Sequence, residues 1–211
     1  MRQQEVLMKK VLLINGSPHP HGCTDTALRE VASALEKEGV SWDIHWIGTK
    51  PVAGCIACQK CGETGRCIFD DQVNRILDHL DDYGALVVGS PVYYAGPAGQ
   101  LCALLDRLFY CGSDRMAGKF GAAVVSCRRG GASAAFDRLN KYFTICNMPV
   151  VSSQYWNQVH GFTPDDVRKD SEGLQTMRTL GQNLAWLLKC RENSSVPLPE
   201  YEAVTFTNFI R

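Results

Sequence analysis

Four closely spaced cysteines are the densest group of chemically reactive side chains in the sequence. Cys55, Cys58 and Cys61 follow a C-x-x-C-x-x-C pattern, and Cys67 comes after five further residues. Such spacing lets a short loop wrap around a metal cluster, and cysteine thiolates are the usual ligands of iron–sulfur clusters. The four cysteines therefore predict a 4Fe-4S cluster site.

Three other interpretations of this cysteine segment compete with the cluster. Four thiolates also hold structural zinc, although two C-x-x-C pairs separated by a long spacer are more usual. Either C-x-x-C pair suits a redox-active dithiol, and the plainest alternative is a loop of free thiols. Because four reduced thiols in an irregular loop are a liability without a metal, the pattern favours the cluster in the living cell.

A second group of polar residues lies in residues 16–24, between an apolar run and a helix-like pattern. Free N–H groups and the helix dipole favour an anion at such a position, and the hydroxyls of Ser17 and Thr24 add donors. The segment is neither a Walker A loop nor a G-x-G-x-x-G fingerprint, so one terminal phosphate is the expected ligand. In the alternative, the hydroxyls only cap the helix. The candidate contacts are Ser17, His19, Gly22, Cys23 and Thr24.

Two further segments follow apolar runs and carry side chains suited to a ligand. In the first, two adjacent tyrosines follow a proline, which suits a flat ring system with polar edges. In the second, paired arginines beside glycines offer charge-assisted donors to a ring carbonyl or to the phosphates of a second nucleotide. In the alternative to ligand binding, the tyrosines only cover the sheet edge and the arginines are ordinary surface residues. The candidates are Pro91, Val92, Tyr93 and Tyr94 in the first segment, and Ser126, Arg128, Arg129, Gly130 and Gly131 in the second.

These segments must be positioned by regular elements, and the apolar pattern predicts which ones. Short apolar runs predict strands over residues 10–15, 41–47, 85–89, 120–126 and 149–155. Apolar residues at helical spacing predict helices over residues 24–38, 71–80, 100–109, 132–146 and 171–189. Such alternation is typical of an α/β domain, a three-layer doubly wound five-stranded parallel sheet. Ligands of that architecture bind outside the carboxyl ends of the strands, where the three ligand-type segments lie.

Composition and charge exclude several classes of function. The 211 residues are 45% hydrophobic and 21% charged, and 22 Lys+Arg balance 22 Asp+Glu. The lack of a basic excess argues against nucleic-acid binding, and the apolar runs are too short to span a membrane. The N-terminus lacks the apolar stretch of a secretory signal, so we expect a cytoplasmic protein. We expect one domain over residues 1–190 with a cysteine-rich insertion at 54–67, followed by an extended arm over residues 191–211.

From about Val11 to Lys189 the chain resembles the NADPH-dependent FMN reductases and iron–sulfur flavoproteins of the flavodoxin-like superfamily. The resemblance implies strand order 2-1-3-4-5 and an FMN phosphate held by Ser17, Thr24 and the backbone N–H of Cys23. Residues 91–94 would follow the isoalloxazine and residues 126–131 its other edge, and the cysteine motif matches that of the iron–sulfur flavoproteins. The matching residues are Gly16-Ser17-Pro18, Thr24, Ser90-Pro91-Val92-Tyr93, Asp106-Arg107 and Gly130-Gly131.

The resemblance implies an FMN-dependent oxidoreductase that passes electrons from NAD(P)H to a quinone, an azo or nitro compound, a flavin or a one-electron acceptor. No catalytic side chain is assigned, because the cofactor carries the chemistry. A homodimer or homotetramer is implied, with residues 204–209 as a candidate interface element. The first alternative is a flavodoxin-type electron carrier, but such proteins tend to be smaller and strongly acidic. The second is a zinc-stabilised interaction module that merely shares the fold.

Overall fold

A parallel β-sheet forms the centre of the molecule in the computed structural model, which describes residues 9–203, 205 and 207. The parallel strands lie in the order β2-β1-β3-β5-β6, and the short β4 pairs antiparallel with β3. When only the five parallel strands are numbered along the chain, this order is the predicted 2-1-3-4-5. The strands are β1 (Lys10–Asn15), β2 (Trp42–Trp46), β3 (Tyr83–Tyr93), β4 (Gly96–Pro97), β5 (Phe120–Cys127) and β6 (Gln158–His160).

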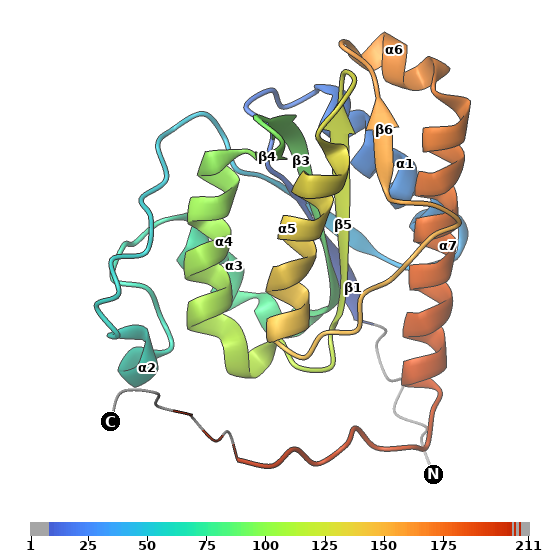
Figure 1. Ribbon diagram of the computed structural model, residues 1–211. Helices are drawn as coiled ribbons and strands as arrows, with labels where there is room; N and C mark the ends of the chain where they lie inside the picture. Colours follow the sequence, from blue (N-terminus) through green and yellow to red (C-terminus); the bar gives the residue numbers. More distant parts are fainter. Residues whose placement is uncertain (1–8, 204, 206, 208–211) are drawn as a thin grey trace.

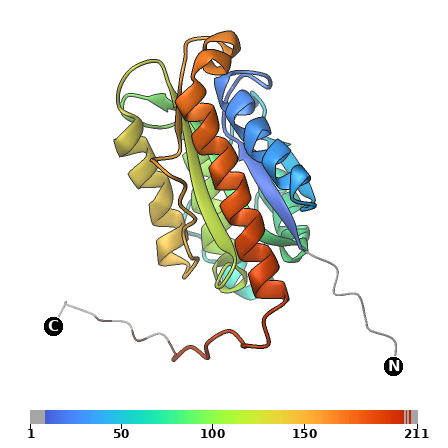
Figure 2. The same cartoon turned by 90° about the vertical axis from the view of Figure 1, so that its right-hand side faces the viewer.

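Helices cover both faces of the sheet, which confirms the three-layer architecture (Figures 1 and 2). On one side lie α3 (Gln72–Asp78), α4 (Gly99–Gly112) and α5 (Ala132–Ile145); on the other lie α1 (Cys23–Lys37) and α7 (Ser171–Glu192). The shorter helices are α2 (Cys61–Thr64) and α6 (Pro164–Lys169), with 3-10 turns at Leu80–Asp82 and Ser113–Arg115. Neither α2 nor α6 was expected from the sequence.

Two hydrophobic cores follow from the alternation of side chains along β1. Leu12 and Ile14 pack under α3, α4 and α5, whereas Val11 and Leu13 pack under α1 and α7. All four side chains are buried. Since successive residues of a strand point to opposite faces, a continuous apolar run is what a strand covered on both sides requires.

The predicted fifth strand over residues 149–155 is wrong in position. In this segment only Val150 forms an isolated bridge, to Gly121 of β5. The chain then leaves the sheet, because the Ser153 hydroxyl bonds the backbone of Tyr155 and forms a local turn. It rejoins the sheet as β6, at residues 158–160.

The third strand also differs from the prediction, which ended it before Ser90. In the structure β3 continues through Pro91, which lies opposite Ser126 of β5. On its other side β1 ends opposite Gly89, so Pro91 has a strand neighbour on one side only. A proline is tolerated at such an edge position, because no ladder hydrogen bond is lost there.

The expected arm begins after α7, and its described part up to residue 203 has no regular secondary structure. Residues 204, 206 and 208–211 lie outside the described part, and with them most of the candidate interface element. Among the described helices, none combines the length and the apolar character that crossing a lipid bilayer requires.

Candidate functional site

The segments after β1 and β5 meet at the carboxyl edge of the sheet. Thr24 Oγ1 lies 2.9 Å from Ser126 Oγ, and both side chains are buried. This bond joins the start of α1 to the end of β5. Two of the three ligand-type segments that the sequence singled out are thus held together, although 102 residues separate these hydroxyls in the chain.

The segment after β1 is shaped by residues that the sequence analysis did not single out. Asn15 is fully buried, and its Oδ1 accepts the N–H of Ser17 at 3.0 Å. The Ser17 Oγ accepts the N–H of His19 at 3.1 Å, and the Trp46 indole donates to the Ser17 carbonyl at 2.8 Å. At Gly16 a Cβ would lie 2.5 Å from Leu101, so only glycine fits there. The loop is therefore rigid before any ligand binds.

The N-terminus of α1 points its free N–H groups to this edge. Gly22 is its N-cap residue, and no side chain caps it. Asp25 in the first turn is paired with Arg29 at 2.7 Å and lies 3.5 Å from His21. Cys23 directs its thiol to the carbonyl of Gly161 at 3.7 Å, and burial, opposed by a backbone hydrogen bond, raises the thiol pKa. The Cys23 side chain is therefore a neutral thiol directed at the Gly161 carbonyl.

The tyrosine segment forms the tip of the β3–β4 hairpin. Val92 pairs with Pro97 and Tyr93 with Gly96, so Tyr94 and Ala95 are the two central residues of the turn. Both have left-handed backbones, with φ of 51° and 59°. A two-residue turn of this kind normally contains Asn or Gly, and other residues there cost on the order of 1–3 kcal/mol each. Tyr93 and Tyr94 are both exposed at this edge.

The arginine segment packs against the tyrosine hairpin. Gly131, the N-cap residue of α5, has φ of 85°, and a Cβ built on it would lie 2.8 Å from Cα of Ala95. Arg128 and Arg129 are exposed, and neither forms an ion pair with a residue in the described ranges. Gly130 is exposed with open space around its Cα. The structure therefore gathers all three segments along one edge.

A small cavity of about 160 Å³ opens between the segments that follow β1, β2 and β3. It is smaller than the roughly 300–1,000 Å³ of a typical ligand pocket, so it would hold only part of a larger ligand. Tyr93 is the only sequence candidate in its lining, beside Pro18, Thr49 and Gln100. Gln100 donates to the Gly48 carbonyl at 2.9 Å. The segment after β2 was missed because no sequence signal distinguishes it from an ordinary loop.

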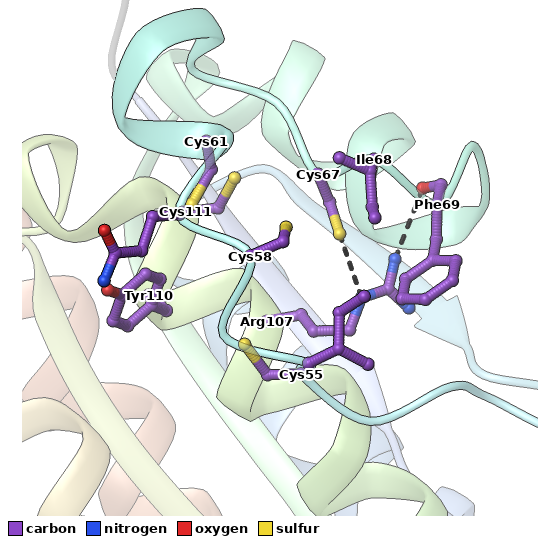
Figure 3. Close-up of a pocket in the computed structure, with 11 residues that line it drawn as sticks. Cys55, Cys58, Cys61, Cys67, Ile68, Phe69, Arg107, Tyr110 and Cys111 are labelled. Carbon is purple, nitrogen blue, oxygen red and sulfur yellow. Dashed lines mark hydrogen bonds between the residues drawn. The ribbon is translucent and has the colours of Figure 1, made fainter.

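The four motif cysteines (Cys55, Cys58, Cys61 and Cys67) line a second pocket, beside α4 (Figure 3). We call it the cysteine pocket. Cys55 and Cys58 are exposed, whereas Cys61, at the start of α2, and Cys67 are partly buried. Cys111 of α4, from outside the motif, also lines it.

The backbone of the cysteine loop is strained around its second thiol. Ala57 and Gln59 have positive φ angles of 53° and 60° and flank Cys58. Left-handed backbone at two residues other than glycine is uncommon and clusters at functional sites. Here it winds the loop so that successive motif cysteines face one pocket.

Cys67 is held more firmly than the other motif cysteines. The side-chain amide of Asn74 accepts the Cys67 N–H at 2.8 Å and donates to the Cys67 carbonyl at 2.9 Å. Arg107 Nε donates to Cys67 Sγ at 3.2 Å, as Figure 3 shows. Burial alone would raise the pKa of Asp71, but hydrogen bonds from Arg107 and Val73 and the neighbouring arginine charges hold it below its ordinary value. Asp71 is therefore an anion that pairs with Arg107.

The donor set of the cysteine pocket suits a cluster better than a single ion. Within the described part of the chain, no three His, Cys, Asp or Glu side chains are arranged to hold one metal ion. The four motif thiols nevertheless line one pocket. A 4Fe-4S cluster binds each thiolate to a different iron atom, so its ligands lie farther apart than those of one ion. The four motif cysteines are therefore a donor set of the kind that a 4Fe-4S cluster uses.

The two sites lie along α4, one at its first residues and the other beside its middle and end. Gly99 and Gln100 line the cavity at the carboxyl edge, while Tyr110 and Cys111 line the cysteine pocket. At 1.5 Å per residue these positions are about 16 Å apart along the helix axis. The two sites share no lining residue, although Arg107, in the middle of α4, also lines the cysteine pocket.

Two comparisons with known protein sequences cover most of the chain. Residues 9–163 match the family model described as NADPH-dependent FMN reductase. An iron-sulfur flavoprotein of Methanocaldococcus jannaschii is 33% identical over 188 residues, which cover 85% of this chain and 97% of that protein.

Solved structures with low sequence identity share the fold. RosB, bound to 8-demethyl-8-formylriboflavin-5′-phosphate, aligns with a TM-score of 0.69 at 13% identity, over 95% of this chain and 96% of RosB. The NAD(P)H:quinone oxidoreductase of Methanothermobacter marburgensis aligns with a TM-score of 0.63 at 15% identity, over 83% of this chain and 96% of that one. These likenesses bear out the flavodoxin-like fold.

Proposed function

The chain belongs to the NADPH-dependent FMN reductase family, and on that premise we propose that it is an FMN-dependent oxidoreductase that also binds a 4Fe-4S cluster. Electrons enter from NAD(P)H and leave to a second acceptor. The observation that carries the proposal is the presence of two sites in one chain: an uncapped helix start at the carboxyl edge, and a pocket lined by all four motif cysteines.

The carboxyl edge suits FMN in its charge and rigidity. The free N–H groups in the first turn of α1 bind the terminal phosphate, since they have no capping side chain. Thr24 contributes its N–H more than its hydroxyl, because the hydroxyl is already bonded to Ser126. The flat ring lies against the Tyr93–Tyr94 turn on one side and the Gly130–Gly131 segment on the other. Preformed loops of this kind avoid the cost of ordering the site on binding.

When bound, FMN supplies hydride chemistry and the cluster supplies one-electron transfer. The residues of the chain bind, orient and shield these groups, and none needs to act as an acid or base. The exposed Arg128 and Arg129 are placed to attract the phosphates of NAD(P)H. The acceptor is then a quinone, an azo or nitro compound, a free flavin or a one-electron carrier.

An assembly of two or four copies is part of the proposal. Since the two sites of one chain are separated along α4, electron transfer between them is shortened if the cysteine pocket of one copy faces the carboxyl edge of another. Deleting residues 197–211 tests whether the arm contributes to that interface; an unchanged oligomer would exclude it.

A cytoplasmic location also belongs to the proposal, and ten free cysteines suit a reducing compartment.

One anaerobic preparation of the full chain tests the proposal. After reconstitution with FMN, iron and sulfide, we expect bound flavin and about four iron atoms per chain, with little zinc. NADPH or NADH oxidation should then be measured with menadione as acceptor. Bound flavin without pyridine-nucleotide turnover would instead support an electron carrier.

Matched cysteine variants separate the two cofactors. Cys58→Ser should lose most of the iron and keep FMN, whereas Cys190→Ser, at an exposed position on α7, should keep both. A chain that stays colourless with excess FMN and shows no fluorescence quenching would refute the flavin site. A chain that binds FMN but takes up no iron would refute only the cluster.

A further inference from the structure

Arg107 is an unusual residue to find beside a cluster site, because it is both charged and buried. Its side chain lies in the middle of α4 and is 1% exposed. Besides the bond from Nε to the sulfur of Cys67, its guanidinium donates to the carbonyls of Ala53 and Phe69, each at 3.3 Å. It also lies 4.9 Å from the centre of the Phe69 ring. All five hydrogen bonds that the Arg107 side chain donates therefore end in or next to the cysteine loop.

The ion pair with Asp71 fixes the direction of the Arg107 side chain. Asp71 accepts two hydrogen bonds, from Nη1 at 2.7 Å and from Nη2 at 2.9 Å. This bidentate pair leaves Nε facing Cys67. The Asp71 carboxylate is one-third exposed, so solvent partly screens its charge, whereas the guanidinium is fully shielded. The positive charge therefore acts on the cysteine pocket more strongly than its counter-charge does.

A purely structural role does not require the bond to sulfur. The bonds from Nη1 and Nη2 already tie Ala53, Phe69 and Asp71 to α4. The Nε bond is instead directed at the thiol of Cys67. The side chain of Asn74 also bonds the backbone N–H and carbonyl of this residue. Hydrogen bonds to the sulfurs and local net charge are among the factors that set the reduction potential of an iron–sulfur cluster.

We propose that Arg107 is a positioning residue for the cluster: it holds the Cys67 sulfur in its ligating orientation and raises the reduction potential of the cluster. The reason is electrostatic. One-electron reduction adds negative charge to the cluster, and a buried cation with an N–H directed at a ligand sulfur stabilises that charge. This inference rests on the proposed cluster and concerns one residue outside the cysteine motif.

The test is an anaerobic redox titration of the reconstituted full chain, followed by electron paramagnetic resonance. Arg107→Gln removes both the charge and the N–H fork, so its midpoint potential should fall below that of the wild type. Arg107→Lys keeps the charge and should lie between them. Arg115→Lys is the matched control, because Arg115 is a more exposed arginine paired with Asp81, and it should leave the potential unchanged.

Asp71→Asn gives a second test in the opposite direction, should Arg107→Gln fail to fold. This variant keeps the guanidinium but removes its counter-charge, so the midpoint potential should rise. A general loosening of the loop would not shift the potential upward in one variant and downward in the other. Unchanged potentials in both Asp71→Asn and Arg107→Lys would overturn the inference.

The proposed function and this inference fail in distinguishable ways. If the wild-type chain takes up neither iron nor sulfide, the cluster proposal is wrong and the role of Arg107 is wrong with it. If the wild type holds a cluster and the variants share its potential and iron content, only the role of Arg107 is wrong.

Discussion

The hydroxyls of Thr24 and Ser126 lie 2.9 Å apart beneath the carboxyl edge of the sheet, and both side chains are almost completely buried. Thr24 belongs to the first turn of α1, and Ser126 to the end of β5. The bond therefore fixes the spacing between the segment proposed to bind the FMN phosphate and the segment proposed to close the site.

Thr24→Val should lower the stability of the apo chain by about 1–3 kcal/mol, because it leaves the buried Ser126 hydroxyl without its partner. The double variant, Thr24→Val with Ser126→Ala, should lose less free energy of unfolding than the sum of the two single variants. The reason is that it leaves no buried hydroxyl without a hydrogen-bond partner. Urea denaturation of the four chains gives the coupling energy. A stable Thr24→Val chain with weakened FMN binding would show instead that the hydroxyl serves the phosphate directly.

Gly131→Ala should weaken FMN binding by roughly 10-fold or more, equivalent to about 1.4 kcal/mol. The new Cβ would lie 2.8 Å from Cα of Ala95, at a backbone φ of 85° that alanine disfavours, so the two segments would be pushed apart. Gly39→Ala is the matched control, since Gly39 has a similar φ of 73° but its Cβ would meet open space, outside the proposed FMN contacts. Fluorescence quenching of FMN measures both. Equal affinities in the two variants would contradict this packing.

Ala95→Gly should stabilise the folded chain by about 0.5–1 kcal/mol, because glycine adopts positive φ without strain. The same substitution at Ala134, an exposed position within α5, should destabilise by a similar amount, since glycine is a poor helix former. Thermal unfolding of the two variants measures this difference in sign. Destabilisation by both would mean that the hairpin turn is not strained.

Lys119 should make stability depend on pH above neutrality. Its Nζ donates to the Tyr83 carbonyl at 2.7 Å, and burial, reinforced by the charge of Lys9, lowers its pKa from 10.5 to about 8. Between these values the unfolded chain binds more protons than the folded chain, so the free energy of unfolding should rise as pH increases from 8 to 10.5.

Lys119→Met removes this titration. Relative to the variant, the wild type should gain up to about 3 kcal/mol across that pH range, since the pKa falls from 10.5 to about 8 and one pKa unit corresponds to about 1.36 kcal/mol. Urea denaturation of both chains in reducing buffer, at pH 8 and at pH 10.5, measures the difference in their free energies of unfolding. Thiols and tyrosines titrate in both chains, so their contribution cancels in this difference. A constant difference between the two chains would show that Lys119 keeps its ordinary pKa.

The layers and the main elements were predictable because local patterns specify them. Apolar runs such as residues 10–15 can only be strands covered on both faces, and helical spacing located α1, α4, α5 and α7 to within a few residues. The fifth strand was misplaced because residues 149–155 have a strand-like composition, while the hydrogen bonds of the Ser153 hydroxyl, which composition does not reveal, turn the chain out of the sheet.

By itself, the sequence determined which residue types were available for chemistry: the four motif cysteines, the glycine- and hydroxyl-containing segment at residues 16–24, and the tyrosine and arginine segments. Only the tertiary structure decided their neighbours. It brought Arg107 to Cys67 across 40 positions and Ser126 to Thr24 across 102. The physical reason is that spacing along the chain encodes local geometry, whereas burial, charge and hydrogen-bond partners depend on how distant elements pack.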